Sequence, residues 1–240
     1  MRPPAVERGM ADPPTLAAFY ASPCGTIARG LVRERLLQAW PACTGMSVLG
    51  LGYTEPYLDA WPQARLAVAA GPVWPEPWPA GGRNRAALVE DDALPFPDLS
   101  FDRILLVHAL ETTDSARRLL REVWRVLRDD GQLLVVAPSR VGVWAHSDRT
   151  PFGQGQPYSH GQIGRLLTTS LFQVVLRDGA LYVPPFGCTA ATARVWERAG
   201  RRLMPHLPGV TITGAGKDLY AGVPLQPSRR RAIVLAGARR

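Results

Sequence analysis

The chain has 240 residues, of which 46% are hydrophobic and 20% are charged, and its formal net charge is +8. This length and composition indicate one globular domain, or one domain with an extension, because such a chain can bury roughly 70% of its unfolded surface. They exclude disorder as the general state. The apolar runs are all shorter than the ~18 residues of a membrane helix, so we expect no membrane-spanning segment.

The cysteines and the first residues indicate the compartment. The three cysteines are widely spaced and form no CxxC pair, which argues against a disulfide framework and against a zinc site. The opening residues carry charge without the apolar core of a secretory signal. We therefore expect a cytoplasmic protein that binds no structural metal.

The positive charge is confined to one part of the chain. Residues 1–192 contain eighteen arginines and eighteen acidic residues, whereas residues 193–240 contain nine arginines, one lysine and two acidic residues. Because arginines contact phosphates, this basic segment keeps binding of a nucleic acid as an alternative function. The rest of the chain is neutral and carries no such signal.

The predicted elements alternate between helices and strands. We expect disorder in residues 1–14, a domain over residues 15–221 and a basic tail over residues 222–240. Ser22 followed by Pro23 predicts a helix of about four turns that ends before Pro41. Short apolar runs predict strands over residues 46–51, 65–70, 86–89, 102–107 and 132–137, and the spacing of apolar residues over 113–128 predicts a helix.

Continuous apolar strands that alternate with helices are typical of a parallel sheet covered on both faces. The sequence therefore predicts an α/β fold, a doubly wound Rossmann-like and mostly parallel sheet with an antiparallel C-terminal edge. After a loop over residues 141–158, we expect a helix capped by Ser159, a hairpin of residues 172–177 and 181–183, a helix over 189–204 and an edge strand over 210–213.

One extended motif carries the functional information. Residues 91–110 read DDALPFPDLSFDRILLVHAL, and residues 121–139 read REVWRVLRDDGQLLVVAPS. Over residues 46–138 the chain resembles the class I S-adenosylmethionine-dependent methyltransferases of the type 11 group. Its string VLGLGY, followed by a proline and a tyrosine, is similar to a divergent bacterial branch with a degenerate glycine motif.

The resemblance implies that S-adenosylmethionine is the cofactor and lies at the C-terminal ends of the strands. The implied cofactor-binding residues are Gly50, Gly52, Tyr53, Glu90, Asp91, Asp92, Ala93, Leu94 and His108. Gly50 stands where the family has an acid, Thr54 and Pro56 replace two glycines, and no acid follows Ala70 to hold the ribose. The resemblance assigns no catalytic residue, since the methyl group of the cofactor is already activated.

The loop after the strand 132–137 commonly walls the acceptor pocket in this fold. It offers Trp144, His146 and Tyr158 as contacts of a small-molecule acceptor, with Arg149, Phe152 and His160 nearby. A loop that packs its own aromatic side chains explains the same residues. Two other functions also remain open: a non-catalytic binding or interaction module with this fold, and an RNA-associated protein that uses the Arg-rich C-terminal part.

Overall fold

The structure is a computed structural model and describes residues 15–72, 78–79, 81–147, 150–153, 155–186 and 189–219. The expected disordered segment 1–14 and the expected basic tail 222–240 lie outside these residues.

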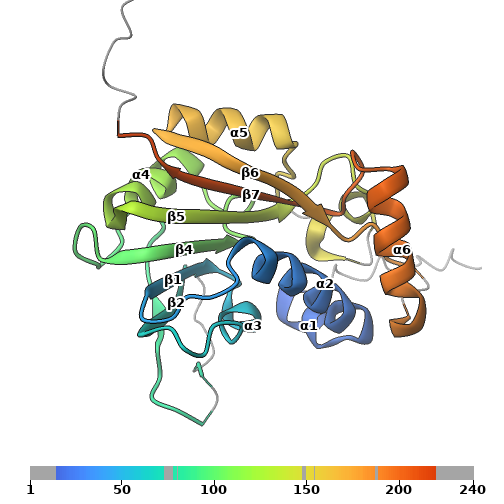
Figure 1. Cartoon of the computed structure of the whole chain (residues 1–240), viewed down its shortest axis with the longest axis horizontal. Helices are drawn as coiled ribbons and strands as arrows, with labels where there is room; N and C mark the ends of the chain where they lie inside the picture. The colour runs from blue at the N-terminus through green and yellow to red at the C-terminus, as the bar shows by residue number, and fades with distance from the viewer. Residues whose placement is uncertain are drawn as a thin grey trace, which may run out of the picture.

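A seven-stranded sheet forms the centre of the molecule (Figure 1). Its strand order is β3-β2-β1-β4-β5-β7-β6. Strands β1 to β5 pair in parallel, and β7 is antiparallel to both β5 and β6. The strands are β1 (Ser47–Gly52), β2 (Leu66–Gly71), β3 (Ala86–Leu88), β4 (Phe101–Val107), β5 (Leu127–Pro138), β6 (Phe172–Ala180) and β7 (Val210–Lys217). The predicted fold class and its antiparallel C-terminal edge are confirmed.

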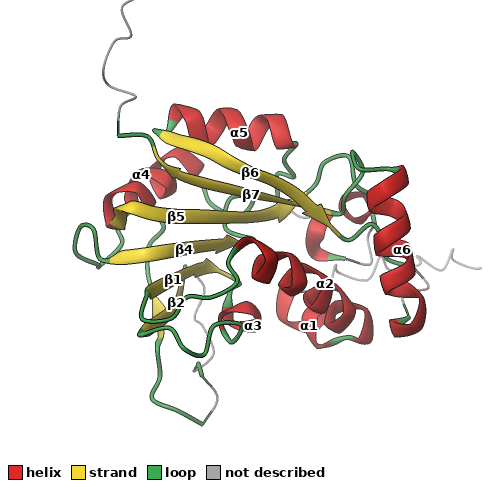
Figure 2. Cartoon of the chain, viewed as in Figure 1, coloured by secondary structure: helices red, strands yellow, loops and turns green. Residues whose placement is uncertain are grey.

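Helices cover both faces of this sheet (Figure 2). One face packs against α1, α2 and α3, with α6 at its border, and the other face packs against α4 and α5. The helices are α1 (Leu16–Ala21), α2 (Pro23–Ala39), α3 (Glu55–Leu58), α4 (Ala116–Val126), α5 (His160–Thr169) and α6 (Ala190–Leu203), with two 3-10 turns, η1 (Val143–His146) and η2 (Pro151–Gly153). Within the described ranges, none of the helices could span a membrane.

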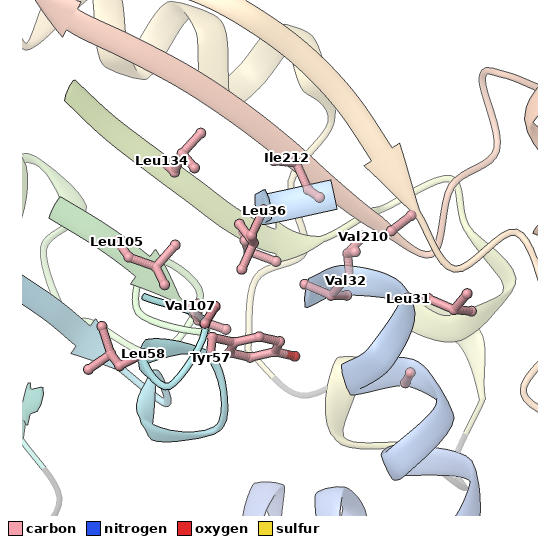
Figure 3. Close-up of a cluster of buried hydrophobic side chains, with 14 of the residues drawn as sticks. Leu31, Val32, Leu36, Tyr57, Leu58, Leu105, Val107, Leu134, Val210 and Ile212 are labelled. Atoms are coloured by element: carbon pink, nitrogen blue, oxygen red, sulfur yellow. The ribbon is translucent and has the colours of Figure 1, made fainter. Parts of the chain in front are cut away.

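Alternate residues of the strands supply the two cores. Leu105 and Val107 of β4 face α2 and α3, whereas Ile104 and Leu106 face α4 and α5, and all four are fully buried. Figure 3 shows the first of these cores between α2, α3 and the sheet. Because both faces are buried, the strands read as continuous apolar runs in the sequence.

The helix ends follow the capping residues that the sequence contains. The Ser22 hydroxyl accepts the N–H of Gly25 at 3.0 Å, with Pro23 in the first turn of α2. Ser159 and Gln162 form a capping box at the start of α5. A side-chain oxygen that accepts these otherwise unpaired N–H groups stabilises a helix start, so both predicted starts are confirmed.

Three predictions about local structure are wrong. Residues 172–180 form one strand, and Leu181 leaves it with a φ of +64°, so the hairpin with residues 181–183 does not form. Strand β7 lies between β5 and β6, which makes β6 the edge. Strand β5 begins at Leu127, five residues before the predicted start, because Leu127 pairs with Phe101 ahead of a bulge.

The LPFPDLSFD motif forms a loop that one arginine holds. Arg125 of α4 donates to the carbonyl oxygens of Leu94 and Phe96, each at 2.8 Å, and pairs with Asp98 and Glu122, each at 2.7 Å. These charge-assisted bonds fix the chain that leads into β4. The motif is therefore a structural feature of the fold as well as a marker of it.

Replacing this arginine tests its contribution. We expect Arg125→Ala to lower the free energy of unfolding by about 1–3 kcal/mol, because two carbonyls and two carboxylates lose their partner. Urea denaturation followed by circular dichroism measures the change. Arg121→Ala, an exposed residue on the same helix, serves as the control and should change the value by less than ~0.5 kcal/mol.

Candidate functional site

The turn after β1 depends on the glycine at position 52. Gly52 has a φ of +86°, and a Cβ there would lie 2.3 Å from the carbonyl oxygen of Val107. The next N–H, that of Tyr53, donates to the same oxygen at 2.8 Å. Since both the backbone angle and the space exclude a side chain, glycine is required, and the C-terminal ends of β1 and β4 are held together here.

Thr54 fills the space that an acidic side chain occupies in the resembled family. A Cβ on Gly50 would lie 2.2 Å from Thr54 Oγ1 and 2.7 Å from Thr54 Cβ. Thr54 is fully buried. The missing acid and the missing glycine are therefore linked, because the threonine side chain fits only where position 50 has none.

The end of β2 lies beside this turn. A Cβ on Gly71 would be 3.6 Å from the carbonyl oxygen of Gly52, which is ordinary van der Waals contact. Ala70 and Gly71 are the last residues of the strand, and Pro72 follows. The position is the one at which the family holds a ribose, and no carboxylate stands at it.

A chain of buried polar groups begins directly after β4. His108 Nδ1 lies 2.7 Å from Glu111 Oε1, and His108 Nε2 lies 2.9 Å from the hydroxyl of Tyr20, which accepts a hydrogen bond from Tyr57 at 3.1 Å. His108 has a φ of +55°. A non-glycine residue in this region of the backbone costs about 1–3 kcal/mol, and histidine is among the residues that adopt it more often than most.

The hydrogen bonds assign the proton positions. A carboxylate beside Nδ1 accepts the proton of that nitrogen, and this leaves Nε2 of a neutral imidazole as an acceptor for the Tyr20 hydroxyl. Burial raises the pKa of Tyr20 well above its usual value, with the neighbouring Tyr57 adding to the effect. The tyrosine thus stays a donor to His108 across the physiological range.

Aromatic side chains close this group off from water. Tyr20 stacks on Tyr53 at a centroid distance of 5.1 Å, and Phe152 stacks on His108 at 5.1 Å. The exposed fractions are 5% for Tyr20, 3% for His108 and 6% for Glu111. Helix α1, which carries Tyr20, therefore covers the polar groups at the ends of β1 and β4.

Three buried side-chain oxygens at this edge of the sheet lack a hydrogen-bond partner in the described part of the chain. They are Thr54 Oγ1 after β1, Glu111 Oε2 after β4 and Ser139 Oγ after β5. Each unpaired buried group of this kind costs about 1–3 kcal/mol. A ligand that pairs with them would recover part of that energy.

The acidic cluster lies in the loop between β3 and β4. Glu90 and Asp92 are exposed, and Asp92 pairs with Arg118 at 3.2 Å. Asp91 is half-buried, and this burial raises the pKa of its carboxyl, which a hydrogen bond with Thr113 partly offsets. Ala93 is exposed and Leu94 is buried in the core below α4.

The predicted acceptor residues occupy different surroundings. Trp144 is fully buried and donates to the carbonyl of Val183 at 2.7 Å, so contact with an acceptor requires this loop to move. His146 is exposed, with Nδ1 3.0 Å from the carbonyl of Gly142. Tyr158 donates to the carbonyl of Leu110 at 3.2 Å and thus lies beside the turn that carries His108.

Sequence reasoning missed two members of the polar group. Tyr20 belongs to α1, a helix that the sequence analysis did not identify, although Thr15 caps it by accepting the N–H of Ala18. Glu111 directly follows the motif of residues 91–110 and was given no role by the sequence. A threonine directly before the apolar run of residues 16–21 was the available signal for α1.

The site fits S-adenosylmethionine in part. The glycine turn of Gly52, the neighbouring end of β2, half-buried Asp91 and the unpaired oxygens match a polar ligand at this edge. Gly50 stands where the family has an acid, and β2 ends in Ala70 and Gly71 where the family has the carboxylate that binds the ribose. The geometry thus retains the turn that approaches the cofactor and lacks two of its usual anchors.

Comparison with known families bears on the class of domain. Residues 49–135 match the model of a methyltransferase domain. This match confirms, for these residues, the resemblance to the class I methyltransferases of the type 11 group that the LPFPDLSFD motif carries.

Curated relatives match part of the chain. An uncharacterised protein of Mycobacterium tuberculosis is 29% identical over 113 residues, which make up 43% of this chain and 40% of that protein's length. The chain thus matches about two fifths of the curated relatives' length.

Two solved S-adenosylmethionine-dependent methyltransferases share the fold at low identity. One, from Thermotoga maritima, has a TM-score of 0.61 and 15% identity, with 81% of this chain and 91% of the other covered. The other, from Archaeoglobus fulgidus, has a TM-score of 0.58 and 16% identity, with 79% and 94% covered.

The link between Gly50 and Thr54 is testable by a double-mutant cycle. We expect Gly50→Ala to cost about 1–3 kcal/mol, because its Cβ overlaps the Thr54 side chain. In a Thr54→Gly background the same change should cost at least ~0.5 kcal/mol less. Urea denaturation of the four proteins gives the coupling, and additive effects would show that the two positions do not share the space.

The buried carboxyl of Asp91 predicts a pH dependence. Its folded-state pKa lies above its unfolded value, so the folded chain binds more protons, and the stability contributed by Asp91 falls as the pH rises from ~4 through the raised pKa. The stability of Asp91→Asn relative to the wild type should therefore increase from pH ~4 to neutral pH. Urea denaturation at both pH values measures this difference, with Asp59→Asn, at an exposed position, as the surface control.

Proposed function

We propose that this protein is a cytoplasmic S-adenosylmethionine-dependent methyltransferase that acts on a small or medium-sized acceptor. The methyltransferase domain over residues 49–135 supports the reaction class. The observation that carries the proposal is the buried group of Tyr20, His108 and Glu111 at the ends of β1 and β4. Strand order reverses between these two strands, and ligands of open α/β sheets bind at such a point.

The residues of the β1 turn and the acidic loop would hold the cofactor. Gly52 gives close access to the backbone, and Asp91 offers a half-buried acceptor to an amino group. Bound S-adenosylmethionine supplies a methyl group on a sulfonium, which needs no further activation. The chain's own tasks are to bind, to orient, to exclude water and to remove a proton from the acceptor.

His108 is suited to receive that proton. Glu111 accepts a hydrogen bond from the N–H at Nδ1. The electron pair of Nε2 is therefore directed at the hydroxyl of Tyr20. An acceptor hydroxyl or amine that takes the place of this hydroxyl would give its proton to Nε2. The charge of Glu111 then stabilises the imidazolium that forms.

Helix α1 acts as the cover of the site. Tyr20 fills the space between Tyr53 and His108, and it leaves the polar groups nearly without contact with water. Displacement of the Tyr20 ring would admit the acceptor, and its return would exclude water during transfer. A small acceptor fits such a site better than a large polymer.

A small-molecule acceptor also agrees with a solved relative. The 1,6-didemethyltoxoflavin N1-methyltransferase of Burkholderia thailandensis, which holds its acceptor and S-adenosylhomocysteine, matches with a TM-score of 0.52 and 16% identity over 80% of each chain. At this identity the likeness concerns the fold, so it does not identify the acceptor of this protein.

A non-catalytic binding module is the second candidate function. Thr54 fills the place of an anchoring acid and the end of β2 carries no carboxylate. A chain that had lost methyl transfer would keep the fold and its buried polar group. The two candidates differ in whether the wild-type protein binds the cofactor.

Calorimetry with S-adenosylmethionine and S-adenosylhomocysteine tests the proposal. We expect both ligands to bind. We expect Glu111→Gln to weaken the binding of the cationic S-adenosylmethionine by about tenfold more than the binding of the neutral S-adenosylhomocysteine, because a buried carboxylate attracts the sulfonium. Glu34→Gln, an exposed residue of α2, is the control and should leave both affinities unchanged.

The outcomes separate the two functions. Absence of binding for both ligands at millimolar concentration would overturn the methyltransferase proposal and favour the non-catalytic module. Equal weakening of both ligands by Glu111→Gln would show that the carboxylate acts on the fold and not on the charge of the cofactor.

A further inference from the structure

A second candidate site lies away from the sheet edge, between α2 and α6. These two helices form a groove of about 620 Å³ whose lining includes four arginines, Arg33, Arg35, Arg194 and Arg198. The volume is in the range of small-molecule sites. In Figure 1 the two helices lie side by side at the end of the molecule where α6 stands.

The four arginines lack carboxylate partners. Among the described residues, none of their guanidinium groups lies within 4.0 Å of a carboxylate. By contrast, Arg201, one turn further along α6, pairs with Asp178 at 2.9 Å. Arg198 Nε donates to the carbonyl of Arg194, at 3.3 Å. Arginines that converge in a groove without an ion pair create a positive potential that attracts an anion.

Arg35 is the buried member of this set. It is 9% exposed, and its Nη1 donates to Gln38 Oε1 at 2.6 Å. A guanidinium has five N–H donors, and this bond uses one of them. Burial of a charge is costly unless it is paired and hydrogen-bonded, so an anion in the groove would stabilise Arg35.

The two glutamates of the groove do not cancel this charge. Glu197 is 4% exposed, and its carboxylate accepts the N–H groups of Leu181 at 3.1 Å and Tyr182 at 2.8 Å. Burial raises the pKa of Glu197, and these backbone hydrogen bonds and the charge of Arg35 partly offset the effect. Glu197 therefore balances part of the charge of Arg35, and the four arginines still outnumber the two glutamates of the groove. Glu34 is exposed, and water screens its charge.

Gly30 leaves space at the same groove. It lies inside α2, lines the groove, and a Cβ there would have no atom within 4 Å. Glycine weakens a helix interior relative to alanine, and packing does not require it here. Its effect is to keep the wall of the groove free of a side chain.

We propose that the groove between α2 and α6 binds a phosphate-bearing small molecule. Guanidinium groups match phosphate oxygens in fork geometry, and several arginines suit an anion with more than one charge better than a single carboxylate. Leu31 and Leu37 add an apolar wall for the remainder of the ligand. The described lining has no aromatic side chain, whereas sites for single-stranded nucleic acid stack bases on such residues.

Inorganic pyrophosphate is the probe for this site. Calorimetry at low ionic strength should give a dissociation constant below about 1 mM. Arg194→Gln and Arg198→Gln should each weaken binding by about tenfold, because each loses a charge-assisted hydrogen bond. Both residues are exposed, so these variants keep the fold, and Arg35→Met provides the buried counterpart.

Two further sets of variants make the test specific. Gly30→Glu places a negative charge in the groove and should abolish binding, while Gly30→Ala should preserve it. The controls Arg117→Gln and Arg121→Gln remove exposed charges from α4 on the other face of the sheet and should leave the affinity unchanged.

Several results would overturn the proposal. They are absence of pyrophosphate binding in the millimolar range, equal loss of affinity in the α4 controls, and binding that Gly30→Glu does not affect. Binding of an RNA oligonucleotide without binding of pyrophosphate would assign the surface to nucleic acid instead. All these readouts are independent of methyl transfer and of cofactor binding.

Discussion

The contact between Gly52 and the carbonyl oxygen of Val107 is the constraint on which the candidate site depends. It joins the last residue of β1 to the last residue of β4, and any side chain at position 52 would overlap that oxygen. Tyr53 and Thr54 follow directly on one side and His108 on the other. The stacking of Tyr53, the buried position of Thr54 and the left-handed backbone of His108 are all set within two residues of this contact.

The pair of Gly50 and Thr54 shows how a family motif can change without loss of the fold. In the resembled motif an acid stands below a glycine turn, whereas here a buried threonine side chain stands where the acid would be. The exchange preserves packing and removes a charge. It leaves a polar edge at which His108 and Glu111 are the buried, hydrogen-bonded pair.

The distribution of arginines separates two kinds of basic residue. Arg125 holds the loop before β4 with bonds to two carbonyls and two carboxylates, so its charge is internal to the fold. Arg194 and Arg198, in the basic C-terminal part of the sequence, line a groove and form no ion pair among the described residues. The net charge of +8 therefore combines structural charges with charges that are available to a ligand.

The sequence by itself determined the elements whose signals are local. Ser22 and Ser159 cap their helices through neighbours three residues away, and the parallel strands are recognisable because burial on both faces requires continuous apolar runs. The LPFPDLSFD motif likewise carried the resemblance to the methyltransferases, whose domain model matches residues 49–135. The tertiary structure alone decided that β6 continues through Asp178 and Gly179, since its partner β7 is distant in sequence. It also brought Tyr20 to His108 across 88 residues, because this contact depends on how α1 packs over the sheet and not on any local pattern.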